Sequence, residues 1–410
     1  MIKENYTRHF QDTTATIVNS RVESIRYKNI TKTGIRVYHE GFIGVAGAIG
    51  DFNEDQLTRE AVDALSQKIE YPAEPSINFN KNIDMRVTHM PENSFRREVE
   101  SFLEELSECR KDFIFSNKIS ITGQKVHMYN ECGLNLEYSD RALQISLVFK
   151  DKSSSNLFDG YFGFDERYYD REKMLEQINM TLDAYSEKVN LPGKGKYPVI
   201  FFKNEFPVGK LISDLRGDVY ATGGSLFSGK EGQQVFNSNL TFFQAMGPHE
   251  VNNMPFFDAE GTVNKDYRYE FIENGVLVAP YTDKRTAAKY GLKLTGSASA
   301  SYDGVPALDF LNFSFRPSEK TVGELLGGKP GIFILVASGG DFTPEGNFAT
   351  PVQLAMLFDG KRFTGRLPEL NISSNLFAML GDDFRGMGKD TVFPYSTEKM
   401  VITEMTVEEA

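Results

Sequence analysis

The sequence predicts an α+β protein, with an N-terminal α/β domain of antiparallel sheet and three helices and a C-terminal domain that is mainly β. Three observations lead to this fold class. At 410 residues the chain exceeds the roughly 100 to 200 residues of a usual single domain. Amphipathic helical patterns are concentrated in the first half of the chain. The second half is rich in glycine and in short runs of β-forming residues.

The N-terminal strands are predicted from short runs of β-forming residues. Residues 34–38 and 41–46 flank a tight turn and predict a hairpin. Between Phe113 and Lys150, period-two patterns predict an antiparallel meander of four short strands. The turns expected to separate these strands are Thr122-Gly123, Glu131-Cys132-Gly133 and Ser139-Asp140.

Helices are predicted where apolar residues recur every three or four positions. The first follows Asn53, a residue type that caps helices, and its apolar face extends to Ile69. The second runs from about Ser94 to Lys111 and presents an apolar stripe to the core. The third covers about 170–189. Each should cover the sheet with one face.

A linker is predicted at residues 190–198, where proline, glycine and lysine are concentrated after the third helix. It divides the chain into an N-terminal domain of residues 1–190 and a C-terminal domain of residues 199–410. In the second domain the clearer helix patterns are confined to residues 208–215 and 286–290. Strands should therefore dominate it.

Composition argues against several classes of protein. The net charge of -12 and the lack of a basic block argue against a direct nucleic-acid partner. The first twelve residues are polar, and no run approaches the roughly 18 apolar residues of a membrane span. We therefore expect a cytoplasmic protein without a membrane partner. Its two cysteines, Cys109 and Cys132, are expected to be reduced thiols.

No histidine pattern predicts a zinc site. A metallopeptidase helix usually carries two histidines one turn apart with a glutamate between them, and the nearest histidines here are 30 positions apart. The partial match at His249-Glu250 has Asn253 where the second histidine would stand. Because Gly247-Pro248 precedes it, we expect His249 in an exposed loop.

Other catalytic and cofactor patterns are incomplete. Cys132 is a candidate nucleophile with His127 as its base, although a structural thiol is the favoured interpretation. Two glycine-rich runs approach the phosphate-binding loop, but Glu231 and Pro330 stand where a Ser or Thr is needed. No cofactor is predicted.

Three segments of the second half carry a more specific signal. They are Phe256–Gly261, Phe271–Leu277 and Asp283–Ala298, and their order and spacing resemble the signature of the TldD/PmbA family. Family members have an Asp-Asp-Glu-Gly turn, an Ile-Glu-Asn-Gly-Val-Leu hairpin and a segment ending in Thr-Gly-Asn-Ala, where this chain has Ser297 in place of Asn. Residues 34–44 and 228–233 are similar to further family turns, so the resemblance spans nearly the whole chain.

The resemblance implies a particular subunit type. In the family, the TldD-type subunit is a zinc peptidase with a His-Glu-x-x-x-His helix and a late cysteine ligand, and the PmbA or TldE-type subunit lacks them and pairs with it. Here Val208, Gly209, Ser213 and Met387 match those positions. None of these side chains replaces imidazole or thiolate around zinc. The chain therefore resembles the metal-free TldE/PmbA type.

The function implied by this resemblance is that of a non-catalytic subunit. It would complete a TldD-like zinc peptidase as a heterodimer and form walls of a cleft for an unfolded peptide. The family label of a modulator of DNA gyrase is interpreted as an indirect effect. The alternative is a stand-alone homodimer that binds peptides or another ligand without cleaving them. A third hypothesis is a hydrolase that uses Cys132, or Asp258 with Glu260.

Six residues within the matching region are candidate cleft or motif residues, although structural roles are favoured for them. Gly261 and Gly296 suit turns, and Asp258 with Arg285 suits an ordinary ion pair. The full set is Asp258, Glu260, Gly261, Arg285, Thr295 and Gly296.

Overall fold

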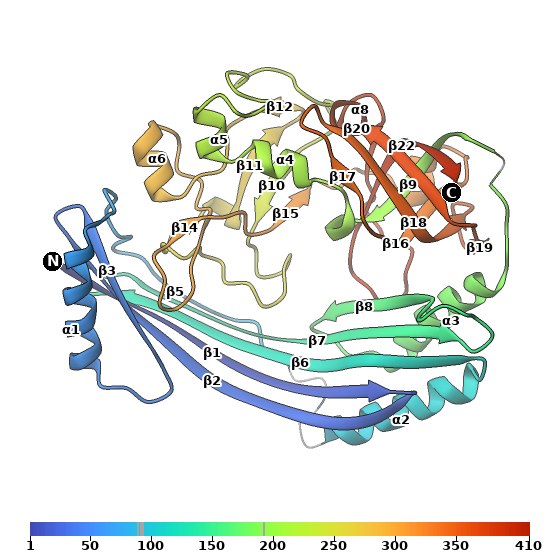
Figure 1. Cartoon of the computed structure of the whole chain (residues 1–410), viewed down its shortest axis with the longest axis horizontal. Helices are drawn as coiled ribbons and strands as arrows, with labels where there is room; N and C mark the ends of the chain where they lie inside the picture. The colour runs from blue at the N-terminus through green and yellow to red at the C-terminus, as the bar shows by residue number, and fades with distance from the viewer. Residues whose placement is uncertain (88–89, 91–93, 192) are drawn as a thin grey trace.

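The α+β fold class is confirmed by a computed structural model, which describes residues 1–87, 90, 94–191 and 193–410. An antiparallel sheet with helices forms the N-terminal part, and the C-terminal part is mainly β (Figure 1). Pro192, in the expected linker, lies outside the described residues. The division into residues 1–190 and 199–410 stays a prediction.

The N-terminal sheet consists of long, curved strands that lie below the rest of the molecule in Figure 1. Its order is β4-β3-β2-β1-β6-β7-β5, with β8 pairing to β7 and β5 running parallel to β7. The strands are β1 (Ile2–Val18), β2 (Arg21–His39), β3 (Phe42–Ile49), β4 (Ile69–Glu70), β5 (Asn80–Asp84), β6 (Phe113–Asn130), β7 (Asn135–Asp151) and β8 (Gly160–Glu166).

The four short strands predicted between Phe113 and Lys150 are two long ones. The turns expected at Thr122-Gly123 and Ser139-Asp140 are wrong, because both pairs lie inside strands. Gly123 is paired with residues of β1 and of β7, and ladders on both sides outweigh a weak turn preference. The turn at residues 131–133 and the hairpin of β2 and β3 are confirmed.

Three helices accompany this sheet: α1 (Glu54–Ala64), α2 (Phe95–Cys109) and α3 (Arg171–Ser186). Asn53 caps α1 as expected, its side chain accepting a hydrogen bond from the Gln56 amide at 2.9 Å. The helix ends before Ile69, which instead pairs with Ile43 of β3. Among the described residues, none of the helices combines the length and apolar character that a membrane-spanning helix needs.

The C-terminal part is built around a closed barrel. Its strands follow the order β16-β9-β22-β20-β18, and β16 closes the ring by pairing with both β9 and β18. These strands are β9 (Gly195–Phe202), β16 (Gly331–Ala337), β18 (Asn347–Phe358), β20 (Leu370–Asn375) and β22 (Met400–Glu409), with β17 (Asp341–Phe342), β19 (Phe363–Arg366) and β21 (Phe384–Met387) attached.

A second sheet lies beside the barrel, in the order β12-β11-β10-β15, with a separate small pair β13-β14. Its strands are β10 (Phe242–Ala245), β11 (Arg268–Glu273), β12 (Val276–Leu277) and β15 (Phe313–Phe315), and the pair is β13 (Ala298–Ser299) and β14 (Ala307–Leu308).

The short helices of this half are α4 (Gly209–Asp214), α5 (Gly217–Ala221), α6 (Lys284–Tyr290), α7 (Val322–Leu326) and α8 (Leu376–Leu380). Only α4 and α6 were predicted, because one helical turn is too short to show a repeat. The capping box of Thr321 and Glu324 was the available signal for α7.

The two halves share one hydrophobic core at the barrel end of the long sheet. Phe149 of β7 stands near its centre, with its ring 5.2 Å from that of Phe162 and 5.3 Å from that of Tyr185. Barrel residues Phe333 and Leu354 belong to the same buried cluster. The packing is so close that a Cβ at Gly160 would lie 2.6 Å from the Phe149 ring. This core fixes one end of the contact between the halves.

We expect Phe149→Ala to lower the free energy of unfolding by about 3 to 5 kcal/mol, because it removes a buried ring and leaves a cavity in the shared core. Denaturant unfolding of the whole chain measures this. Leu157→Ala is the control, since Leu157 is 90% exposed and its change should stay within about 0.5 kcal/mol. Equal effects of the two variants would mean that the core does not hold the halves together.

Candidate functional site

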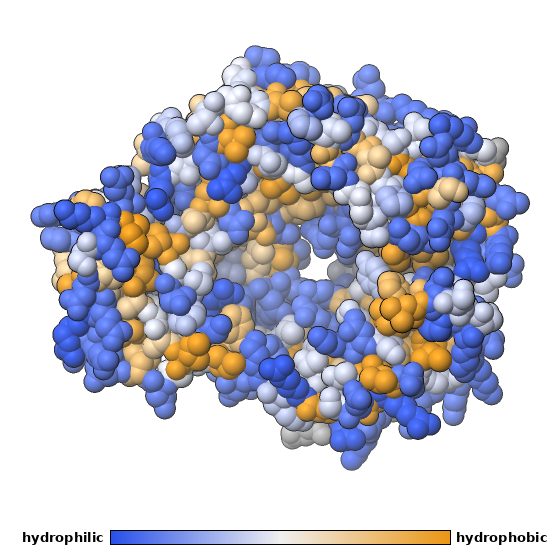
Figure 2. Space-filling model, viewed as in Figure 1, coloured by the Kyte–Doolittle hydropathy of each residue, from blue (hydrophilic) through white to orange (hydrophobic). Residues whose placement is uncertain are grey.

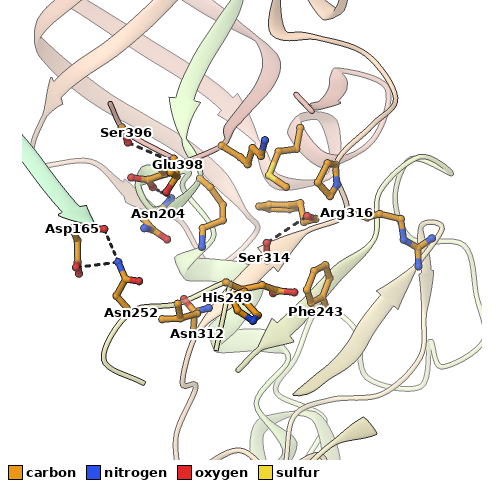
Figure 3. A pocket seen from close by; sticks show the side chains of 18 of the residues that line it. Asp165, Asn204, Phe243, His249, Asn252, Asn312, Ser314, Arg316, Ser396 and Glu398 are labelled. Atoms are coloured by element: carbon orange, nitrogen blue, oxygen red, sulfur yellow. Dashed lines mark hydrogen bonds between the residues drawn. The ribbon is translucent and has the colours of Figure 1, made fainter. Parts of the chain in front are cut away.

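A pocket of about 440 Å³ lies where the N-terminal sheet faces the C-terminal half (Figure 3). Asp165 and Glu166 of β8 form one wall, and Phe243 of β10 with Ser314 of β15 form another. In the space-filling view, an opening runs through the middle of the molecule between the same two halves (Figure 2). The pocket therefore belongs to the junction of the halves rather than to either alone.

The loop from His249 to Asn253 forms a third wall of this pocket. His249 is exposed and lies in a turn, which confirms its expected loop position and excludes a helical ligand pair. The side-chain nitrogen of Asn252 (Nδ2) donates to the Asp165 backbone carbonyl at 2.6 Å and to the Asp165 carboxylate at 3.3 Å (Figure 3). The loop is thus fastened directly to β8.

The buried ion pair of Asp140 and Arg167 also anchors this loop. The Arg167 guanidinium donates to both oxygens of Asp140 at 2.8 and 2.7 Å, and also to the Val251 carbonyl at 2.9 Å. The Asn253 amide donates to Asp140 at 2.6 Å. Burial alone would raise the pKa of Asp140, but hydrogen bonds from Arg167 and Tyr138 bring it below the ordinary value. Asp140 therefore stays ionised and binds the loop to the sheet.

The pocket contains several ionisable groups whose pKa values are shifted by burial. Burial raises the pKa of Glu166, Glu250 and Glu398 and lowers that of Lys203. Glu166 accepts from the Thr397 amide at 2.6 Å, and Glu398 accepts from the Asn204 amide at 2.9 Å. Glu250 is exposed to solvent in the pocket, but the surrounding protein still removes part of the hydration of its carboxylate and so raises its pKa. Shifted groups gathered in a cleft are typical of a binding site.

The four positions that the family resemblance matched to a zinc site carry side chains that do not suit zinc. Val208 precedes α4 and is 4% exposed in the core, while Gly209 and Ser213 lie on the exposed face of that helix. Met387 is 2% exposed and lines the pocket. Across the described ranges, no three His, Cys, Asp or Glu side chains gather where they could hold a metal. A hydroxyl and a thioether do not replace imidazole and thiolate as zinc ligands.

The signature segment forms a buried joint between the halves, here called the polar joint: Glu4, Arg36, Tyr71, Ala259 and Glu260. Arg36 of β2 is 0% exposed and donates to Glu4 at 3.2 Å and to the Ala259 carbonyl at 2.5 Å. The Tyr71 hydroxyl donates to Glu260. Glu260 also accepts from the Lys284 amide at 2.8 Å. Strand β2 and the segment around Tyr71 are thereby tied to the signature turn.

Asp258 organises this turn through backbone contacts. One carboxylate oxygen accepts from the Glu260 amide at 2.9 Å and from the Thr262 amide at 2.8 Å, and the other accepts from the Ala298 amide at 3.2 Å. Gly261 has a φ of 69°, which favours glycine and supports its predicted turn. The suggested ion pair with Arg285 is wrong: no such pair forms between these two described residues, because backbone amides already occupy both oxygens of Asp258.

The remaining signature residues connect this turn to the pocket wall. The Thr295 hydroxyl oxygen accepts from the Thr282 amide at 2.7 Å, and Gly296 has a φ of 68°. The Gly296 carbonyl accepts from the side chain of Gln244 at 2.8 Å. Gln244 is the neighbour of Phe243, which lines the pocket. None of the six signature candidates lines the pocket as described, and Gly296 is the one that bonds directly to β10, through Gln244.

The alternative catalytic groups are not assembled. The His127 ring bonds to Asn135 at 2.8 Å and lies against Tyr129, and among the described residues it makes no hydrogen bond to Cys132. Cys132 is a partly buried free thiol, and its sulfur makes no hydrogen bond to any residue that the structure describes. Asp258 and Glu260 are each 2% exposed and closed off from the pocket. Sequence reasoning missed the pocket residues Lys203 and Glu398, since no motif marks them.

The fold is a closed barrel joined to a long antiparallel sheet, with the pocket at their junction. The chain belongs to the PmbA/TldD family: residues 194–409 match the PmbA/TldA metallopeptidase C-terminal domain. The predicted family is thereby confirmed.

Known relatives agree with this assignment. A protein of Archaeoglobus fulgidus named Metalloprotease is 23% identical over 377 residues, which cover 88% of this chain and 86% of the relative. The zinc metalloprotease TldD homolog of Saccharolobus solfataricus is 27% identical over 205 residues, covering 47% of this chain and 44% of its own.

Solved structures share the whole fold. A Thermotoga maritima protein described as a modulator of a DNA gyrase has a TM-score of 0.81 at 18% identity, covering 99% of this chain and 96% of its own. TldE from Thermococcus kodakarensis has a TM-score of 0.75 at 17% identity, with the same coverage of 99% and 96%. At these identities the likeness establishes the fold.

The polar joint predicts how stability depends on pH. Burial and the nearby Asp258 carboxylate raise the pKa of Glu260 from 4.5 to about 8, and burial raises that of Asp258 from 3.8 to about 6. The folded chain then keeps protons that the unfolded chain releases. The free energy of unfolding should therefore fall as pH rises through this window, by up to about 1.4 kcal/mol per pH unit for each proton.

We expect Glu260→Gln to flatten this fall, because the variant removes the titrating group and the charge that it imposes on Asp258. Denaturant unfolding at several pH values between 5 and about 8 measures the slope. Glu319→Gln, at an exposed glutamate, is the control and should keep the slope of the unmodified chain. Identical slopes for the unmodified chain and Glu260→Gln would show that Glu260 is not the source of this pH dependence.

Asp140→Ala should cost about 3 to 5 kcal/mol, because it leaves the buried Arg167 charge without its partner. Hydrogen exchange should also accelerate at the Asn253 amide, whose acceptor is lost. As control, Asp84→Ala removes an exposed partner of Arg86 and should cost less than about 1 kcal/mol. Unchanged exchange at Asn253 would show that the pair does not hold the loop.

Proposed function

We propose that this chain is a non-catalytic, metal-free subunit of the TldE/PmbA type that completes a TldD/TldE-type metallopeptidase acting on unfolded peptides or small proteins. One observation carries the proposal. The chain has a pocket, which Met387 lines, but the four residues matched to the family's zinc site provide no set of zinc ligands. They are Val208, Gly209, Ser213 and Met387. A cleft retained without its catalytic metal suits binding more than hydrolysis.

The dimensions of the pocket favour an extended peptide. A volume of about 440 Å³ accommodates a few residues and excludes a folded domain. Its lining combines the largely buried rings of Phe243 and Phe315 with hydrogen-bonding groups. Strand β8 borders the pocket and, among the described residues, pairs only with β7, so its other edge offers backbone groups to an added strand. Binding through backbone groups would suit peptides of varied sequence.

The catalytic metal would come from a partner subunit that retains the His-Glu-x-x-x-His helix. The net charge of -12 disfavours direct contact with DNA, so an effect on gyrase would follow from peptide processing. The alternative is a stand-alone homodimeric protein that binds peptides or another ligand without cleaving them. The two proposals differ in whether a zinc-bearing partner is present.

Purification from native cells tests the choice. The tagged chain should bring down a zinc-bearing partner, and zinc analysis should assign the metal to that partner. Cleavage of an unstructured peptide should require both chains and should stop with a chelator, because the metal is the Lewis acid. A homodimer without such a partner would overturn the subunit proposal. Stoichiometric zinc in the isolated chain, or chelator-sensitive cleavage by it, would overturn the non-catalytic assignment.

Filling the pocket tests its part in the complex. Ser314→Trp places a large ring at the pocket wall and should lower cleavage at least tenfold, with zinc content and assembly unchanged. Leu157→Trp, on an exposed loop, is the matched control and should cleave normally. Full activity of the Ser314→Trp complex would mean that the peptide lies elsewhere.

A further inference from the structure

The Lys203 side chain is the unusual group in the pocket. It begins a short 3₁₀ helix, Lys203–Glu205, directly after β9, and its ammonium lies 5.8 Å from the centre of the Phe313 ring. Among the described residues, this ammonium makes no hydrogen bond and no ion pair, and the Glu398 and Glu250 carboxylates act on it only at longer range. A lysine in a pocket with no acceptor of its own is available to a ligand.

The other lysine and arginine side chains around the pocket each have an acceptor already. Arg268 pairs with Glu270 at 3.0 Å, and Arg316 donates to Asn274 at 3.2 Å. Lys399 donates to the Lys389 carbonyl. Lys203 therefore differs from its neighbours in having three N–H donors and no acceptor for them.

Burial makes this arrangement costly for the free protein. Partial removal from water lowers the pKa of Lys203, although Glu398 and Glu250 at longer range act in the opposite direction. An ammonium that has lost hydration gains most from an anionic acceptor that enters the pocket. Such an acceptor would restore the interactions that burial removed.

A cation is a poorer ligand for the same pocket. Two of its carboxylates are occupied, Glu166 by the Thr397 amide and hydroxyl and Glu398 by the Asn204 amide. The pKa values of both are raised, so both take up protons more readily than ordinary glutamates. Glu250 also lacks a partner but is exposed to solvent, so among the described residues Lys203 is the partly buried charged group of the pocket that lacks one.

We propose that Lys203 anchors a carboxylate of the bound peptide, either its C-terminal carboxylate or an acidic side chain. The inference rests on the proposed peptide-binding function and adds the chemistry of recognition. The Lys203 ammonium would donate to the two oxygens of that carboxylate inside the pocket. The anchor would fix one end of the peptide without reading the rest of its sequence.

Fluorescence anisotropy with the full-length protein, in the assembly in which it purifies, tests the anchor. Three labelled, unstructured hexapeptides of alanine, glycine and serine serve as probes: one with a free C-terminal carboxylate, one amidated, and one amidated with an internal aspartate. The free acid should bind about tenfold or more tightly than the plain amide, as a charged hydrogen bond implies. Tight binding of the aspartate peptide would identify a side-chain carboxylate as an equivalent source.

The variant Lys203→Gln should remove the difference between acid and amide while leaving the affinity for the amide unchanged. Its melting temperature should stay the same or rise, because a partly desolvated charge is removed, so a folding defect is not expected. Lys399→Gln is the matched control: its ammonium already has an acceptor in the same pocket, and it should keep the preference.

The outcomes separate the two proposals. If all three peptides bind equally and Lys203→Gln changes none of them, the carboxylate anchor is wrong and the peptide-binding function stands. If the preference persists in Lys203→Gln, a different group recognises the carboxylate and the anchor is equally wrong. If no peptide binds, the peptide-binding function fails, and the anchor with it.

Discussion

The hydrogen bond from the buried Arg36 guanidinium to the Ala259 carbonyl is the contact on which the arrangement of the two halves depends. It crosses from the long N-terminal sheet to the signature turn and is supported by Glu4 and by the Tyr71–Glu260 pair. At the other end of the sheet, the core around Phe149 joins the same halves through apolar packing. The pocket lies between these two attachments, so its width follows from both.

The polar groups near the pocket divide into those with complete partners and those without. Asp140 with Arg167 and Asp258 with its three amides are buried and fully engaged, and they hold the walls in position. Lys203 is partly buried and unengaged, which is costly unless a ligand or water supplies an acceptor. The groups that have hydrogen-bond partners therefore account for the shape of the pocket. Lys203, which has none among the described residues, is the group to which we assign recognition of a carboxylate.

Membership of the PmbA/TldD family accounts for the fold without deciding the chemistry, because function resides in the site. Val208 and Met387 belong to the hydrophobic core. The walls of the pocket are positioned by other contacts, through Gln244 to the signature and through Asn252 to β8. Glycines serve this scaffold as well: a Cβ at Gly34 would lie 1.7 Å from the Tyr302 carbonyl oxygen, so the loop can reach β2 only at a glycine.

Local pattern in the sequence was enough to determine the long amphipathic helices α2 and α3, the fold class, the family signature and the absence of zinc ligands, since each depends on residues near one another in the chain. Tertiary structure decided the rest. Gly123 lies in a strand because two neighbouring strands bond to it, and Ile69 leaves its helix to pair with Ile43. Asp258 was expected to pair with Arg285 and instead binds backbone amides. Within the described part of the chain, Lys203 lacks a hydrogen-bond partner only because folding places it among side chains that bond to other groups. Such environments arise from contacts between residues far apart in sequence, which no local pattern records.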